Sequence, residues 1–188
     1  MNDYKSNISS YLKRHNEAVE LMSVDDINDL MNVLVEARDS KKTIFIMGNG
    51  GSGATASHFA GDFNKGASFN KEKKFRFICL NDNIPTLMAY ANDSSYGEIF
   101  VGPLKNFMEE GDVVIGISGS GNSANVVKAL EWANANGGIT VGITGYDGGI
   151  VKKISHHNVH VPIHDMQITE DLHMMLDHCM MQIICEQE

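Results

Sequence analysis

Two apolar runs that each end in a loop of glycines and hydroxyl side chains constrain this chain more than any other feature. Residues 44–47, Ile-Phe-Ile-Met, lead into Gly-Asn-Gly-Gly-Ser, and residues 113–117 lead into Ser-Gly-Ser-Gly-Asn-Ser. A helix-like stretch follows each loop. A buried strand that passes through such a loop into a helix offers backbone N–H groups, hydroxyl donors and the positive end of a helix dipole. The sequence therefore predicts a site for a phosphorylated small molecule, with the alternative that both loops are only tight turns.

Neither loop fits the better-known phosphate motifs. The Walker motif needs a lysine and a hydroxyl residue after its second glycine, whereas Gly51 is followed by serine and glycine. Gly48, Gly50 and Gly53 have the spacing of the dinucleotide motif. That motif also needs an acidic residue at the end of the next strand, about twenty residues on, and Asp82 lies well beyond that distance.

The composition bounds the class of protein. A chain of 188 residues suits one domain, 1–188, in which helices at 1–40 precede an α/β core at 41–188. Hydrophobic residues make up 43% and no apolar run has membrane-spanning length, so no membrane partner is expected. The start lacks a secretory signal and the three cysteines lack metal-type spacing, which predicts a reduced, cytoplasmic protein. A net charge of −9 argues against nucleic-acid binding.

Hydrophobic periodicity predicts alternating strands and helices after two N-terminal helices. The expected helices are 8–20, 27–38, 53–65, 97–108, 123–136 and 166–185, and the expected strands are 43–47, 75–80, 112–117, 139–144 and 158–163. Near-continuous apolar strands that alternate with helices indicate an α/β fold, a doubly wound five-stranded parallel sheet covered on both faces. Ligands of such sheets bind at the C-terminal ends of the strands, where both serine-bearing loops lie.

The two loops, together with Ser-His-Phe-Ala at 57–60 and Thr-Gly-Tyr-Asp-Gly-Gly at 144–149, resemble the sugar isomerase (SIS) family. The resemblance is specifically to its phosphoheptose isomerase group, and it extends over nearly the whole chain. It implies a homotetramer that converts sedoheptulose 7-phosphate into a D-glycero-D-manno-heptose 7-phosphate for surface polysaccharide synthesis.

The resemblance also implies roles for individual residues. The sugar phosphate would be bound by the hydroxyls of Ser52, Ser118, Ser120 and Ser123, with Gly119 between two of them and with backbone from Asn49, Gly50 and Gly51. These are neutral donors near helix N-termini, which bind phosphate without a lysine. Asp62 and His178 stand at the positions of the catalytic pair. Asp93 resembles an active-site aspartate of the family, with a turn or helix-cap residue as the alternative.

A divalent metal, with zinc expected, is implied at His58, Asp62, Glu170 and His178. His58 and Asp62 are four residues apart and so share one face of a helix, as metal ligands often do. Glu170 and His178 are eight apart and could line one cleft with the substrate. His173 and Asp177 form another pair with a spacing of four. Asp62 and Glu170 replace the glutamate and the glutamine of the family.

The leading hypothesis is a phosphosugar aldose–ketose isomerase in which Asp62 is the base and His178 the acid. An isomerase of another phosphosugar is the first alternative. A non-catalytic protein that binds a phosphosugar or another protein, like the initiator-associating protein, is the second. Apolar faces on helices 8–20, 27–38 and 166–185 predict burial against other subunits.

Overall fold

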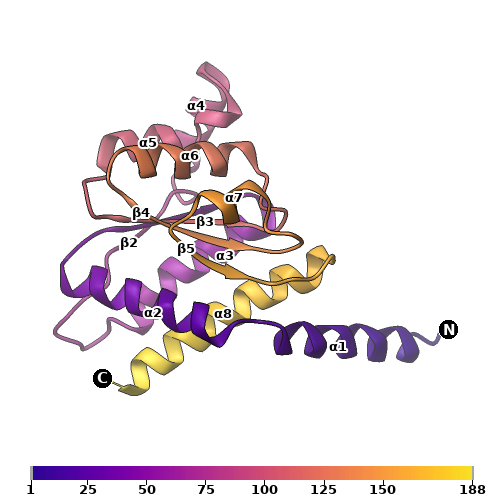
Figure 1. The fold of residues 1–188 in the computed structure, drawn as a ribbon. Coiled ribbons are helices and arrows are strands. Elements are labelled where there is room, and N and C mark those ends of the chain that lie inside the picture. The colour runs from indigo at the N-terminus through magenta and orange to yellow at the C-terminus, as the bar shows by residue number, and fades with distance from the viewer. Residues whose placement is uncertain (1, 188) are drawn as a thin grey trace.

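A five-stranded, all-parallel sheet forms the centre of the computed structural model, which describes residues 2–187 (Figure 1). Its strands are β1 (Ile44–Gly48), β2 (Phe77–Cys79), β3 (Val113–Ser118), β4 (Ile139–Thr144) and β5 (His157–His160). Their order in the sheet is β2-β1-β3-β4-β5. From β1 the chain passes to β2, which lies on one side of β1, and it later returns to β3 on the other side of β1. The connections that follow β1 and β3 therefore diverge, and ligands of open α/β sheets bind at such a point.

Helices cover both faces of the sheet, which explains why every residue of the central strands β1 and β3 is buried (Figure 1). One layer contains α2 (Val24–Asp39), α3 (Gly50–Gly61) and α8 (Met166–Gln187), and the other contains α4 (Ile84–Asp93), α5 (Val101–Phe107), α6 (Ala124–Ala135) and α7 (Gly149–Ile154). Successive strand residues point to opposite faces. Ile44 and Ile46 accordingly join the core beneath the first layer, and Phe45 and Met47 join the core beneath the second.

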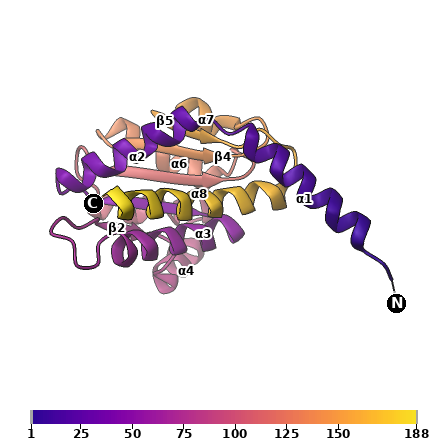
Figure 2. The ribbon, with the colours of Figure 1, turned by 90° about the horizontal axis from the view of Figure 1, so that it is seen from below.

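The N-terminal helix α1 (Lys5–Glu20) extends away from the body of the molecule (Figures 1 and 2). The middle of this helix is attached to α8 and to the segment before α8. The Tyr11 hydroxyl donates a hydrogen bond of 2.5 Å to Asp171, and Arg14 pairs with Asp165. The next helix begins as predicted, because the Ser23 hydroxyl accepts a hydrogen bond from the Asp26 N–H and caps α2.

The sequence-predicted helix at 53–65 differs in extent from the structure. It begins three residues earlier, at Gly50, and α-helical geometry ends at Gly61. A π-helical turn, Asp62–Gly66, follows, in which the Ala67 N–H donates to the carbonyl of Asp62 over 2.9 Å. Asp62 therefore lies where the helix widens, and such π turns are frequent at functional sites.

Two helices were not predicted, and one predicted helix is divided. Hydrophobic periodicity does not predict α4, because none of its residues is buried. It does not predict α7 either, because six residues are too few to show a pattern. The predicted helix 97–108 is a 3₁₀ turn, Tyr96–Glu98, followed by α5. The last strand ends at His160 rather than at 163, because Pro162 lacks the N–H that a ladder needs. None of the described helices has the length and apolar character to cross a membrane.

Candidate active site

The two serine-bearing loops meet at the C-terminal edge of the sheet, because β1 and β3 are paired in parallel. Between them lies a hollow of about 180 Å³, lined by Asn49, Ser52, Ile117, Ser118, Gly119, Ser120, Ser123, Met166 and Glu170. The Ser118 and Ser123 hydroxyls lie 3.1 Å apart and share one hydrogen bond. No lysine or arginine of residues 2–187 lines the hollow, so hydroxyls and helix N-termini are its donors.

Glycines allow the loops to approach one another. Gly50 has φ +53° at the start of α3, a conformation that L side chains rarely adopt. Gly121 has φ +67°, and a Cβ there would lie only 2.0 Å from the carbonyl oxygen of Gly148. The loops after β3 and β4 are therefore in close contact.

A pair of asparagines joins the first loop to α6. The Asn49 amide donates to Asn125 over 2.8 Å, and the Asn125 amide donates back over 2.9 Å. The Tyr96 hydroxyl also donates to Asn49. Asn125 was not predicted as a site residue, because its partner lies 76 positions away and no local pattern connects them. The Asn49 side chain thus fixes the separation of the two loops.

A second group of side chains lies where α3 and α8 run side by side (Figure 2). His58 on α3 and His178 on α8 bring their Nε2 atoms to 3.0 Å. Asp62 lies one turn after His58, and its carboxylate is 3.6 Å from the His58 Nε2. The structure thus brings together three residues that the sequence predicted as metal ligands.

Asp177 is the fourth member of this group. One ligand atom from each of His58, Asp62, Asp177 and His178 lies within 4.8 Å of the other three. Glu170, which the sequence analysis assigned to the metal, is not part of the group. Its carboxylate faces the serine hollow and occupies the space beside Gly51, where a Cβ would lie 2.4 Å from the Glu170 Oε2.

Buried polar side chains continue along α8 at intervals of four residues. Thr169, His173 and Asp177 are each 1% exposed or less, and their side-chain polar atoms have no hydrogen-bond partner among the described residues. Burial, and next the nearby Asp62, raises the pKa of Asp177 to about 7. Burial lowers the pKa of His173 to about 4, although the backbone of Thr144 favours its charged form.

Asp93 lies apart from both groups. It is exposed at the end of α4, where it accepts a hydrogen bond of 2.7 Å from Asn92. It lines a different surface hollow, together with Thr86 and Tyr90.

The serine hollow and the His–Asp group lie along the same pair of helices. Gly51 and Glu170 face each other at one end, and His58 and His178 face each other farther along. Seven residues of α3 separate Gly51 from His58, a rise of about 10 Å. One extended ligand can therefore reach both groups.

Comparisons with known proteins agree with this architecture. A model of the SIS domain family matches residues 3–145. A phosphoheptose isomerase from Geobacter metallireducens is 36% identical over 183 residues, which cover 95% of this chain and 94% of that protein. A probable phosphoheptose isomerase from Thermoplasma volcanium is 33% identical over 178 residues, which cover 94% and 90%.

The solved structure of phosphoheptose isomerase from Neisseria gonorrhoeae has a TM-score of 0.88 and 25% identity to this chain, and the match covers 97% of this chain and 98% of that one. The predicted fold is confirmed by the sheet and by this match. The family model and the relatives together show that the chain belongs to the SIS domain family, within its phosphoheptose isomerase group.

Proposed function

We propose that the protein is an aldose–ketose isomerase that converts sedoheptulose 7-phosphate into D-glycero-D-manno-heptose 7-phosphate. The proposal rests on two chemically different groups along α3 and α8. One is a hollow lined by serine hydroxyls, and the other is an acid–base group of histidines and aspartates. The names of the relatives, which are phosphoheptose isomerases, support the same substrate.

The phosphate end of the sugar would lie in the serine hollow. Ser52, Ser118, Ser120 and Ser123 supply hydroxyls, and Asn49, Gly50, Gly51 and Gly119 supply backbone. Glu170 also lines the hollow, where a carboxylate accepts hydrogen bonds from sugar hydroxyls. The separation of about 10 Å along the helix suits an extended seven-carbon chain, whose carbonyl end would reach His58 and His178.

The reaction moves one proton from C1 to C2 of the ketose and one hydroxyl proton from O1 to O2. Asp62 takes the carbon-bound proton at C1, which leaves an enediolate, and the proton returns to C2. Without a bound metal, the His178 Nε2 transfers the proton between the two oxygens. A carboxylate and an imidazole suit these roles because both exchange protons near neutral pH when they are suitably placed.

A divalent metal fits the His–Asp group, and zinc is the ion we expect there. His58, Asp62 and His178 would hold it. Neighbouring nitrogens around a tetrahedral zinc ion lie about 3.3 Å apart, and the two Nε2 atoms here lie 3.0 Å apart. A metal bound at this point would polarise the sugar carbonyl. Asp62 would retain a second oxygen able to accept a proton.

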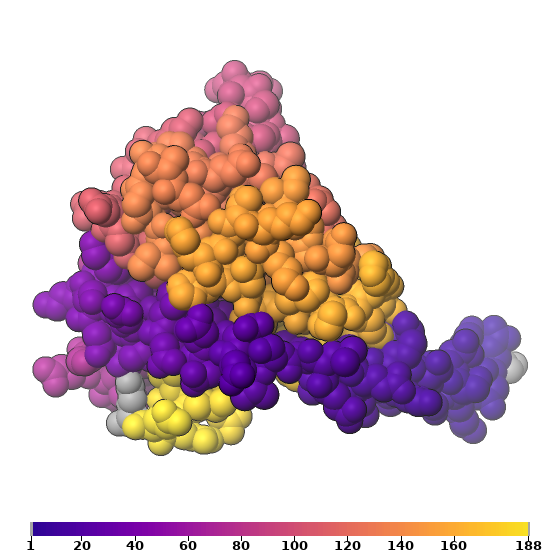
Figure 3. All heavy atoms as spheres, viewed as in Figure 1, coloured from indigo at the N-terminus to yellow at the C-terminus, as the bar shows by residue number. Residues whose placement is uncertain are grey.

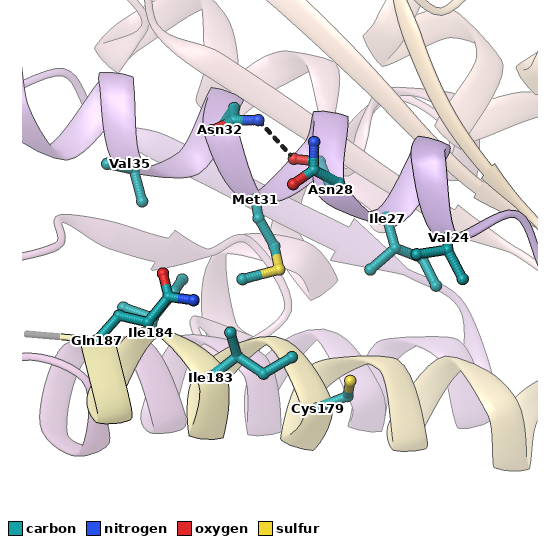
Figure 4. Close-up of a pocket in the computed structure, with 10 residues that line it drawn as sticks. All are labelled: Val24, Ile27, Asn28, Met31, Asn32, Val35, Cys179, Ile183, Ile184 and Gln187. Atoms are coloured by element: carbon teal, nitrogen blue, oxygen red, sulfur yellow. Dashed lines mark hydrogen bonds between the residues drawn. The ribbon is translucent and has the colours of Figure 1, made fainter.

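We also propose that the chain assembles into a homo-oligomer, a tetramer as in the family it resembles. Figure 4 shows a groove in which Ile27 and Met31 of α2 point toward Ile183 of α8. The groove has a volume of about 510 Å³ and is mostly apolar. Ile8 and Leu12 are 56% and 57% exposed on the protruding α1 (Figure 3). Burial of these surfaces against other copies would remove them from water.

The test of the isomerase is proton exchange in deuterated water. Asp62→Asn and His178→Gln should each lower turnover of sedoheptulose 7-phosphate by about a hundredfold or more, with little change in substrate affinity. Asp25→Asn and His164→Gln, which alter exposed residues outside the site, are matched controls. Wild-type protein should place deuterium at C2 of the product. Binding of the sugar phosphate without deuterium incorporation, with several divalent metals supplied, would refute the isomerase and favour a non-catalytic phosphosugar-binding protein.

A further inference from the structure

Asp177 is a buried carboxylate without a hydrogen-bond partner in the described part of the chain. Its side chain is 0% exposed, and neither carboxylate oxygen has a hydrogen-bond partner within residues 2–187. A buried ionised carboxylate costs several kcal/mol or more unless it is paired with a cation or bound by a metal. Such a group either takes up a proton or has a positively charged partner.

The position of Asp177 indicates what that partner is. A carboxylate oxygen of Asp177 lies within 4.8 Å of ligand atoms from His58, Asp62 and His178. Two carboxylates this close repel each other unless one takes up a proton or a cation lies between them. Imidazole nitrogens at the same point do not provide a permanent charge, whereas a divalent ion neutralises both carboxylates.

The spacing of the donor atoms fits one ion. Ligand atoms around a tetrahedral zinc ion lie about 3.3 Å from one another. Here the two imidazole nitrogens are separated by 3.0 Å, and the Asp62 oxygen lies 3.6 Å from the His58 nitrogen. Asp177 comes from α8, beside His178, while His58 comes from α3 and Asp62 from the π turn that follows α3.

We propose that Asp177 is a ligand of the metal at this site, so that two histidines and two aspartates bind a divalent ion without Glu170. The inference rests on the metal centre of the proposed function and not on its substrate. The two carboxylates balance the charge of the ion, and the site suits zinc, cobalt, iron or manganese. Glu170 is then free to face the serine hollow, where the structure places it.

The experiment measures cobalt binding to metal-free protein in the absence of sugar. Cobalt(II) can replace zinc in tetrahedral sites, and its visible absorption reports the number and type of ligands. Asp177→Asn should weaken cobalt affinity by at least about tenfold and alter the spectrum. Glu170→Gln is the matched control, and it should leave both the affinity and the spectrum as in the wild type.

Asp177→Leu is a second variant that keeps the test valid if Asp177→Asn folds poorly, because it fills the buried position with an apolar side chain. Both Asp177 variants should be at least as resistant to heat as metal-free wild type, while cobalt should raise their melting temperature less. Cobalt binding by both variants with wild-type affinity and spectrum would overturn the proposal, as would wild-type protein that binds no cobalt. Since no sugar is present, an inactive isomerase would leave these results unchanged, and loss of cobalt binding would not by itself remove the isomerase.

Discussion

Acid should destabilise this protein through His173, by an amount that follows from its burial. The imidazole is 1% exposed on α8, and burial lowers its pKa from 6.5 to about 4. Between these values the unfolded chain binds a proton that the folded chain does not, so the free energy of unfolding falls as the pH falls. A difference of 2.5 pKa units corresponds to about 3 kcal/mol once the pH is below both values.

Two other groups facing this region change the same measurement. His160 on β5 has its pKa lowered by burial, so it also destabilises the fold in acid. Asp177 acts in the opposite direction, because its pKa is raised to about 7 and its burial becomes less costly as it takes up a proton. Both groups remain in a His173→Leu variant. The difference between wild type and variant in the pH dependence of the free energy of unfolding is therefore the contribution of His173.

The assay is urea denaturation of metal-free protein at about pH 7.5 and about pH 4.5. Over this interval the free energy of unfolding of the wild type should fall by about 2.5 kcal/mol more than that of His173→Leu. His164→Leu, which removes an exposed histidine, should keep the pH dependence of the wild type. If the free energies of unfolding of wild type and His173→Leu differ by the same amount at both pH values, the reasoning is refuted.

Other predictions concern the serine hollow, the loop contacts and assembly. Replacing both Ser118 and Ser120 with alanine removes two donors worth about 1 kcal/mol each, so calorimetry should show roughly thirtyfold weaker binding of the phosphorylated sugar and unchanged binding of the unphosphorylated one. Gly121→Ala should lower the free energy of unfolding by more than about 2 kcal/mol, because its Cβ would meet a carbonyl oxygen at 2.0 Å. Gly61→Ala, with no atom within 4 Å of its Cβ, should be neutral or stabilising by about 0.5 kcal/mol in the same denaturation experiment. Met31→Asp places a charge in the α2–α8 groove, and light scattering should show a smaller assembly than for the wild type.

The core of the fold was predictable because its signals are local and strong. The central strands β1 and β3 are runs of apolar residues, and Ser23 is an N-cap residue that predicts the start of α2, as the structure confirms. The helix α4 also carried a local signal, since the Asn83 side chain caps it and Pro85 stands in its first turn. It was missed because none of its residues is buried, and apolar periodicity reports only on burial.

The site was predictable only in part, for a related reason. His58 and Asp62 are four residues apart, so helix geometry alone places them together. Asn125 and Asn49 meet through the sheet, and sequence patterns contain no information about a pair so far apart. Asp177 was named only as a partner of His173, because adjacent positions on a helix diverge by about 100° and a neighbour of a ligand is expected to point elsewhere.

Asp177 gives a common physical reason for two departures from the family pattern. The shorter carboxylate of Asp62 replaces a glutamate and reaches less far from α3, and the π turn that begins at this residue alters the path of the helix there. A second carboxylate, Asp177 from α8, then supplies an oxygen donor close to the His58–His178 pair. If the metal binds without position 170, that position no longer has to provide a neutral amide ligand, and a glutamate there can face sugar hydroxyls beside Gly51. The substitutions at these positions are therefore expected to be coupled: restoring glutamate at position 62 should reduce the loss of metal affinity caused by Asp177→Asn, and a double-mutant cycle measures that coupling directly.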